Sequence, residues 1–226
     1  MEIQFFGHSC FTIKVSGKQL LFDPFISGNP LAKEINIDAI EADYILVSHA
    51  HGDHIGDLVY LAKKTKALVI GSFELTNWLI KQGHTHVHPM NLGGKKVFEF
   101  GSIKMTYAAH SSSFDDGSYG GVAAGYLLET DSINVYYSGD TALTQEMRVL
   151  AEMHQIDWAL LPIGDNFTMG MEDAAMAASF LNCKQVIGIH YDTFGLIKID
   201  HEKAIAAFAE KQINLKLLKI GEQFTI

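Results

Sequence analysis

The sequence predicts an α/β fold in which two β-sheets pack face to face with helices outside. Two observations support it. Residues 2–25 and 84–140 contain short runs rich in β-branched and aromatic residues, which are typical of paired strands. Each of these parts is followed by apolar runs that alternate with helical patterns, as in βαβ units. Because the pattern occurs twice, we expect a single domain over residues 1–226 with two pseudo-symmetric halves, about 1–115 and 116–226.

In the first half, the hydrophobic pattern changes between the period of a strand and that of a helix. QLLFDPF predicts a strand that stops at Asp23-Pro24, because proline cannot donate a hydrogen bond to a sheet. In HIGDLVYLAKKT, Ile55, Leu58 and Leu61 recur at helical spacing. The order predicted is strands at 3–15, 19–25 and 44–49, a helix at 54–65, a strand at 66–72 and a helix at 73–83.

The second half begins with strands and ends with alternating strands and helices. Glu172 and Asp173 open one of these helices, where negative charge complements the helix dipole. The predicted strands are 84–90, 95–100, 103–111, 124–130, 133–140, 158–164, 185–191 and 215–220, and the predicted helices are 144–154, 172–183 and 201–212.

Composition limits the classes of partner. The chain has 17 Lys and Arg against 26 Asp and Glu, a formal net charge of -9, so it lacks the broad basic surface that binds nucleic acid. We expect no signal peptide, because residues 1–15 contain neither a basic region nor a long apolar run, and we expect no membrane span, because no apolar run approaches about 18 residues. Two cysteines, Cys10 and Cys183, match no disulfide framework or zinc motif. We therefore expect a cytoplasmic protein that acts on a small molecule and has no membrane partner. The charge disfavours nucleic acid as a partner but leaves a small local basic patch open.

The stretch VSHAHGDHIGD, residues 47–57, concentrates metal-binding groups. In an extended segment alternate side chains point the same way, so His49 and His51 should project together. Gly52 permits a tight turn, after which Asp53 and His54 face back toward the same point. The first pair can serve one cation and the second pair another, and imidazole with carboxylate suits zinc, manganese or iron better than calcium. The alternative is a polar surface loop.

Three further candidates follow strands in other parts of the chain. His110, Asp140 and His190 each end an apolar run and precede small or polar residues. Any one of them alone could be an ordinary hydrogen-bonded loop residue. Their shared placement favours a site, because ligands of open α/β folds gather where strand ends meet loops.

Taken in order, LLFDP, SHAHGDH, AAHSSS, YSGDT and GIHYDT resemble the motifs of the metallo-β-lactamase superfamily over essentially the whole chain. The resemblance implies a four-layer αββα sandwich and two divalent metal ions per chain, zinc or manganese, with iron and nickel as further candidates. It implies that His49, His51 and His110 hold the first ion. It assigns Asp53, His54 and His190 to the second ion, Asp140 to a bridge between them, and Asp23 to support of the ligands.

FFGHSCFTIK, LLPIGDNFTMG and HYDTF resemble a short, single-domain branch of metal-dependent hydrolases that is similar to the ascorbate-6-phosphate lactonases. That branch implies a homo-oligomer and names no substrate for this chain. Flavodiiron proteins share the fold but carry glutamate in place of His51, which argues against an oxygen- or nitric-oxide-reducing module.

The resemblance leads to a mechanistic expectation. A hydroxide shared by the two metal ions would attack a small ester, lactone or phosphoester. Asp53 would orient this nucleophile, and Asp23 would accept a hydrogen bond from a ligand imidazole. His8 could contact substrate or donate a proton, or could be a satisfied histidine of the sheet. Residues 111–121 and Asp165 stay open between substrate contact and ordinary loop structure. The alternative functions are an RNA phosphodiesterase or nuclease and a non-catalytic, metal-binding regulatory protein.

Overall fold

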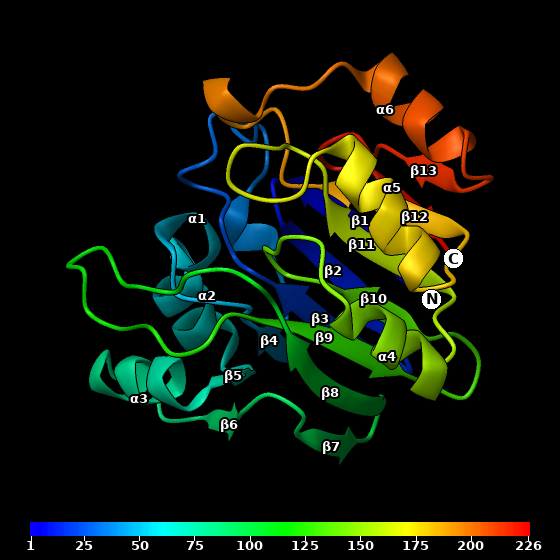
Figure 1. The fold of residues 1–226 in the computed structure, drawn as a ribbon. Coiled ribbons are helices and arrows are strands. Elements are labelled where there is room, and N and C mark those ends of the chain that lie inside the picture. The colour runs from blue at the N-terminus through cyan, green and yellow to red at the C-terminus, as the bar shows by residue number, and fades with distance from the viewer. The chain divides into compact units, whose positions relative to one another are not determined.

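Two mixed β-sheets, each of seven strands, form the framework of the computed structural model, which describes residues 1–226 (Figure 1). Residue contacts group the chain into two units, each holding one sheet. The first unit comprises residues 1–94, 111–123 and 219–226, and the second comprises 95–110 and 124–218. The predicted α/β class, with two mixed sheets and helices, is confirmed, and the single domain with two similar halves stays a prediction. None of the helices is long and apolar enough to cross a membrane.

The sheet of the first unit has the order β14-β1-β2-β3-β4-β5-β6. Pairing is antiparallel from β14 to β3 and parallel from β3 to β6. The strands are β1 Glu2–Gly7, β2 Cys10–Val15, β3 Lys18–Phe22, β4 Tyr44–Leu46, β5 Leu68–Ser72, β6 Val87–Met90 and β14 Gln223–Thr225. The helices are α1 Gly52–Ile55, α2 Leu58–Thr65 and α3 Phe73–Lys81, with a 3₁₀ turn at Ile37–Ala39.

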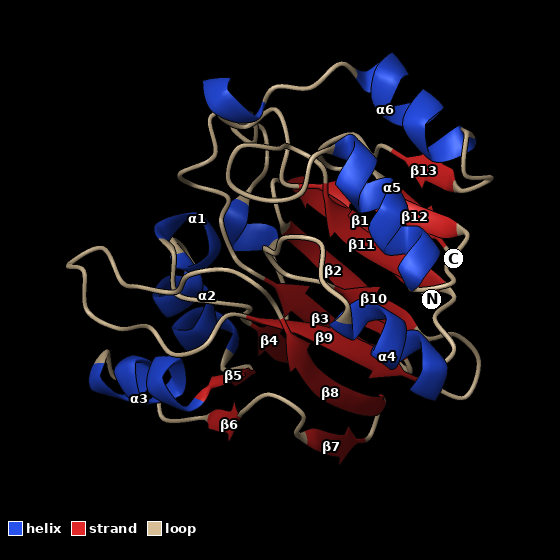
Figure 2. Cartoon of the chain, viewed as in Figure 1, coloured by secondary structure: helices blue, strands red, loops and turns tan.

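The second unit repeats this plan with the order β13-β12-β11-β10-β9-β8-β7. Pairing is antiparallel from β7 to β10 and parallel from β10 to β13. The strands are β7 Lys95–Phe98, β8 Gly101–Tyr107, β9 Ala124–Glu129, β10 Val135–Tyr137, β11 Trp158–Pro162, β12 Gln185–Ile189 and β13 Asn214–Lys216. The helices are α4 Glu146–Met153, α5 Met171–Phe180 and α6 His201–Ala209, with a 3₁₀ turn at Gly195–Ile197 (Figure 2).

Each sheet buries apolar side chains against its own helices. In the first unit, Leu21, Ile45 and Val69 pack with Leu61 of α2 and Leu79 of α3. In the second unit, the small face of α5, Ala174 to Ala178, lets that helix lie close to the strands. Burying these side chains stabilises each unit by roughly 1.5–3 kcal/mol per large aliphatic residue.

The predicted strand at 3–15 is wrong as one element, because the chain turns back at His8-Ser9 to form β1 and β2. Gly7 and His8 adopt positive φ angles of 98° and 56°. A Cβ on Gly7 would lie 2.6 Å from Nδ2 of Asn29, so both its conformation and its surroundings favour glycine. The turn places His8 at the end of a hairpin, where its side chain can leave the sheet.

The predicted helix at 54–65 is also wrong as one element, since it divides into α1 and α2 at Gly56-Asp57. The buried Asp57 carboxylate accepts hydrogen bonds from the backbone N–H groups of Ile26, at 2.6 Å, and Ser27, at 2.9 Å. These bonds to a segment about thirty residues earlier hold the chain where the helix breaks.

Several predicted strands extend too far at their carboxyl ends. The strand at 44–49 ends at Leu46, that at 103–111 ends at Tyr107, and that at 133–140 ends at Tyr137. Val47 and Ser138 still donate a backbone hydrogen bond to the neighbouring strand, and the candidate ligands lie beyond them. One strand, β14, was not predicted at all, and it adds the C-terminal segment to β1.

Candidate metal centre

The His-x-His pair lies between β4 and α1, as its spacing predicts. Nε2 of His49 and Nδ1 of His51 are 2.9 Å apart. Two ligands of one metal ion, each about 2.0–2.1 Å from it, lie between about 2.9 and 3.3 Å apart for right-angled to tetrahedral geometry. The separation of the two ring nitrogens therefore suits a shared cation. On the other side of the second ring, Nε2 of His51 lies 3.4 Å from the Ser111 hydroxyl.

Asp23 organises the base of this cluster. It follows β3, has a φ of 40°, and its carboxylate is completely buried. Oδ1 accepts a hydrogen bond of 2.7 Å from the backbone N–H of Ser48, and Oδ2 accepts one from the Ser48 hydroxyl. Oδ2 also lies 2.6 Å from Nδ1 of His54. A carboxylate that holds one nitrogen of an imidazole fixes the tautomer and directs the other nitrogen, here Nε2, toward a metal.

The same hydroxyl group extends the network to the next ligand. Ser48 Oγ lies 2.9 Å from Nδ1 of His49, which leaves Nε2 of His49 directed at His51. Asp23 thus acts on His54 directly and on His49 through Ser48. One ligand atom each of Asp23, His49 and His54 lie within 4.8 Å of one another. Because both Asp23 oxygens already accept hydrogen bonds, we assign it to support of the ligands.

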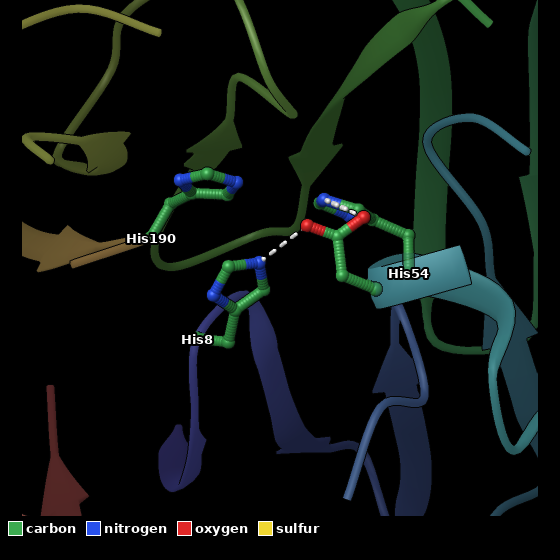
Figure 3. Close-up of side chains that lie close together, drawn as sticks. His8, His54 and His190 are labelled. Carbon is green, nitrogen blue, oxygen red and sulfur yellow. Dashed lines mark hydrogen bonds and ion pairs between the residues drawn. The ribbon is translucent and has the colours of Figure 1, made fainter. Parts of the chain in front are cut away.

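Asp53 and His8 form a second contact in the first unit. Nε2 of His8 lies 3.0 Å from Oδ2 of Asp53, the contact drawn as a dashed line in Figure 3. His54 Nε2 lies 4.0 Å from the other oxygen of that carboxylate. The His8 side chain is fully buried, whereas 28% of the Asp53 side chain is exposed. Asp53 is therefore the member of the pair that can meet solvent or substrate.

The second unit brings together the three other predicted ligands. Nε2 of His190 lies 3.0 Å from Oδ2 of Asp140, and Nε2 of His110 lies 3.6 Å from the same oxygen. Asp140 and His190 are each 2% exposed. Two imidazoles that converge on one carboxylate oxygen form a compact group of nitrogen and oxygen donors.

Backbone contacts fix the loops that carry these donors. The N–H of Ala109 donates to the Thr141 hydroxyl at 2.9 Å, and the N–H of Ala142 donates to the Ala109 carbonyl at 3.2 Å. The segment before His110 is thereby joined to the segment after Asp140. His190 itself has a φ of 55°, a conformation that turns the chain directly after β12.

Residues 111–121 form a loop that is anchored to the first unit. Ser112 accepts a hydrogen bond from the Ala50 N–H at 3.2 Å, beside the histidine motif. Phe114 is buried and stacks on Trp78, with ring centroids 4.7 Å apart. The tip of the loop, residues 115–119, is exposed. Substrate contact by this tip stays a prediction.

The cysteines are unsuited to metal binding or nucleophilic chemistry. Burial raises the pKa of the Cys10 thiol far above its ordinary value, although Cys10 lies two residues after His8. Burial also raises the pKa of Cys183 to about 11. Both thiols are therefore protonated at neutral pH, and the thiolate is the form that binds metal or attacks.

The donor set fits divalent metal ions that accept both imidazole and carboxylate. Oxygen-only ligation, which calcium requires, is not offered by either group. Zinc, manganese and iron accept such mixed nitrogen and oxygen ligands. The predicted residues of each unit converge within that unit: His8, Asp23, His49, His51, Asp53 and His54 in the first, and His110, Asp140 and His190 in the second.

Two supporting residues were missed from the sequence. The sequence pattern contains Ser48 only as part of the histidine motif and gives no role to the hydroxyl of Thr141. Their roles depend on partners far along the chain, so no local pattern indicates them.

A separate groove of about 600 Å³ in the second unit is lined by residues 151–157 with Leu181, Asn182 and Lys184, and it includes none of the predicted ligands.

Comparisons with known proteins show which proteins the chain is similar to. Residues 2–190 match the model of the beta-lactamase superfamily domain. The chain is 51% identical over 226 residues to a UPF0173 metal-dependent hydrolase of Methylacidiphilum infernorum, and 47% identical over 226 residues to one of Flavobacterium johnsoniae. In both cases the match covers 100% of this chain and 100% of the relative.

Solved structures share the fold. Igni18, a metallo hydrolase of the archaeon Ignicoccus hospitalis, superposes with a TM-score of 0.89 and 32% identity, covering 100% of this chain and 98% of that one. An isothiocyanate hydrolase from Delia radicum gut bacteria has a TM-score of 0.82 at 17% identity, covering 100% and 99% of the two chains. The second likeness concerns the fold alone.

Proposed function

The chain belongs to the metallo-β-lactamase superfamily of metal-dependent hydrolases, and from this we propose that it hydrolyses a small ester, lactone or phosphoester at a centre of two divalent metal ions. The observation that carries the proposal is the contact between the buried Asp23 and His54 at 2.6 Å. Burying a carboxylate without hydrogen-bond partners lowers the stability of the fold. Here the carboxylate is hydrogen-bonded to an imidazole and orients it, so that the second ring nitrogen can bind a metal ion.

The proposed ligands follow the family assignment. His49, His51 and His110 would hold one ion. Asp53, His54 and His190 would hold the other, and Asp140 would bridge. Within the first unit His49 faces His51, as two ligands of one ion would, and within the second unit a single oxygen of Asp140 faces both His190 and His110, as a bridging group would. Zinc and manganese are the ions we propose.

When bound, the two ions would supply a water of lowered pKa as nucleophile and would polarise the bond that is cut. Side chains of this protein would then accept and hold the proton that the water releases. Oδ2 of Asp53 is placed to accept a proton, because that carboxylate is partly exposed. Nε2 of His8, 3.0 Å away and buried, holds the carboxylate in position and can share the proton. His8 thus acts through Asp53, and a direct contact with substrate is not part of this proposal.

The charge of the protein favours a small substrate over RNA. The formal net charge of -9 disfavours a polyanion. Asp115 adds local negative charge, since its Oδ1 would lie 2.9 Å from a Cβ placed on Gly52, in the turn between His51 and Asp53. Among the three bond classes, these charges favour uncharged esters and lactones over phosphoesters.

The test measures metal content and turnover together. Protein purified without chelator is analysed for bound metals and assayed with p-nitrophenyl acetate and bis-p-nitrophenyl phosphate. His51→Ala is compared with wild type, and His86→Ala is the matched control because His86 is an exposed histidine outside the cluster. We expect about two metal ions per wild-type and His86→Ala chain, and a loss of turnover of at least about a hundredfold in His51→Ala.

The outcomes separate the alternatives. Bound metal without any turnover that depends on His51 would support a regulatory metal protein. Turnover of the phosphodiester alone would point to a phosphodiesterase. Absence of bound metal after loading with Zn²⁺ or Mn²⁺ would overturn the ligand assignment.

A further inference from the structure

We propose that three exposed side chains of the second unit, Phe167, Phe194 and Leu196, bind an apolar group of the substrate, so that the enzyme favours substrates with an uncharged alkyl or aryl portion. The inference rests on the hydrolase function proposed above and specifies its substrate class. The side chains are 53%, 38% and 69% exposed, so each offers apolar surface that a ligand could cover.

The three residues occupy the loops that follow the carboxyl ends of two neighbouring strands. Phe167 lies in the segment between β11 and α5, and Phe194 and Leu196 lie between β12 and α6. Strands β11 and β12 are parallel neighbours, with Pro162 opposite Ile189 at their carboxyl ends. Both loops therefore begin beside His190, a proposed metal ligand. In parallel sheets this edge is where substrates bind.

The two loops contact each other directly. A Cβ on Gly164 would lie 2.1 Å from the carbonyl oxygen of His190 and 3.0 Å from Cβ of Ile197. Only glycine allows the β11 loop to approach the β12 loop this closely. The backbone that carries Phe167 thus starts in contact with the backbone of His190.

A second connection joins the Phe167 loop to Asp140. The N–H of Met169 donates to the carbonyl of Thr141 at 3.1 Å, and Met169 is buried. The N–H of Asp165 donates to the Met169 carbonyl at 3.1 Å, which closes the turn. Phe167 therefore stands at the tip of a closed turn that is fixed beside both Asp140 and His190.

The other loop is braced by Asp192. Its N–H donates to the Ile197 carbonyl at 2.8 Å, and its carboxylate accepts from the Ile199 N–H at 3.1 Å and lies 2.6 Å from Nε2 of His201. Phe194 and Leu196 project between these fixed points. A surface held in place before binding loses little conformational entropy when a ligand covers it.

The charges of these two loops indicate which kind of substrate group they favour. Residues 163–170 contain no lysine or arginine, and residues 190–200 contain only Lys198. An anionic group would meet no cluster of positive charge there. An uncharged alkyl or aryl group would instead cover apolar surface and gain the hydrophobic contribution.

The experiment compares p-nitrophenyl acetate, butyrate and hexanoate with the metal-loaded enzyme. Complete burial of one methylene is worth about fourfold in binding, so a half-open surface should give roughly twofold per methylene and about 16-fold in kcat/KM from acetate to hexanoate. The double variant Phe167→Ser, Leu196→Ser should reduce this ratio to about fourfold or less.

The matched control is Val149→Ser, Met153→Ser. Val149 and Met153 are exposed to 54% and 66%, as Phe167 and Leu196 are, but they lie on α4, and Met153 lines the separate groove of the same unit. This variant should keep the wild-type dependence on chain length. An equal loss in both double variants, or a flat dependence in wild type, would overturn the proposal.

A binding measurement distinguishes this inference from the proposed function. Calorimetry on the protein purified without chelator compares N-hexylacetamide with N-ethylacetamide, which are uncharged and cannot be cleaved as esters. We expect about 16-fold tighter binding of the longer amide, lost in Phe167→Ser, Leu196→Ser and kept in the control. If no ester is hydrolysed at all, the proposed function fails while this measurement still decides the inference. Equal affinity for the two amides would overturn it.

Discussion

The Asp23 carboxylate shows how much of the candidate centre depends on one residue without direct metal contact. It is completely buried and accepts hydrogen bonds from the Ser48 backbone, the Ser48 hydroxyl and His54. A buried carboxylate is stable as an anion only when such donors replace its hydration. The same bonds set the orientation of His54 directly and of His49 through Ser48. Stability and metal affinity should therefore both respond to this residue.

Asp23→Asn should weaken metal binding by about 10- to 100-fold. The amide keeps one acceptor oxygen, but its NH₂ group cannot accept from His54 or from the Ser48 hydroxyl. The imidazole of His54 then loses its fixed tautomer. Competition with a chromophoric chelator measures the affinity of wild type and variant for Zn²⁺.

Asp57→Asn is the control for the loss of a buried carboxylate. Asp57 is 7% exposed and accepts from the N–H groups of Ile26 and Ser27. This variant should lower the free energy of unfolding by about 1.5–3 kcal/mol, as expected for bonds to a charged acceptor, without changing metal affinity. Equal metal affinity of Asp23→Asn and wild type would show that the carboxylate does not tune the centre.

At the residue level, the metal-binding side chains could be predicted from the sequence, but several residues that hold them in place could not. The spacing of His49, His51, Asp53 and His54 is local, so it could be recognised directly. Asp57 could not, because its partners lie thirty and thirty-one residues away and only the fold brings them together. His8 was placed inside a strand, since the sequence pattern does not reveal that Gly7 and His8 adopt positive φ angles.

At the level of elements, Glu129 joins three strands and a helix of the second unit. It ends β9, and its carboxylate accepts from Lys95 of β7 at 2.5 Å, from Ser102 of β8 at 3.2 Å and from His154 after α4 at 2.8 Å. Burial raises the pKa of this carboxyl group. The hydrogen bonds and charges of Lys95 and His154 together lower it by more than burial raises it, so the pKa of Glu129 is lower than usual. A lowered pKa in the folded state means that the ionised form stabilises the unit.

Glu129→Gln should therefore remove stability at neutral pH and not at low pH. The contribution of the carboxylate is complete above its unfolded pKa of about 4.3 and is lost as the pH falls through the lower folded value. We expect the variant to be less stable by about 1 kcal/mol at pH 7, and the difference to shrink as the pH falls below the unfolded pKa. Urea unfolding over a series of pH values measures it. Asp131→Asn, at an exposed acid two residues on, should show no such dependence.

The order and type of most elements could be predicted because their periodicity is strong. Their ends could not, because the sequence patterns before His49, His110 and Asp140 continue past the last residue of each strand. The backbone leaves the sheet there to present the ligands. The break between α1 and α2 was missed for a similar reason, since Asp57 is held by a tertiary contact that overrides helical spacing.

At the level of the whole molecule, the chain returns to its starting sheet. Residues 219–226 belong to the first unit, and β14 pairs with β1 in antiparallel register, Ile3 opposite Phe224. The N–H of Phe5 donates to the Glu222 carbonyl, and the N–H of Ile226 donates to the Met1 carbonyl at 3.0 Å. The sequence could not predict this strand, because its three residues show no pattern of their own and depend on an edge supplied from the other end of the chain.

Removal of residues 222–226 should expose β1 as a new sheet edge. The loss of about three backbone hydrogen bonds is expected to lower the free energy of unfolding by roughly 2–4 kcal/mol. The uncovered edge presents unpaired backbone groups that can join another chain, so we also expect self-association. Urea unfolding and sedimentation velocity measure the two effects. The control Gln223→Ala, Thr225→Ala changes exposed side chains but keeps the backbone pairing, and it should behave as wild type. A shortened chain that remains as stable and dispersed as wild type would mean that the first sheet does not need its last strand.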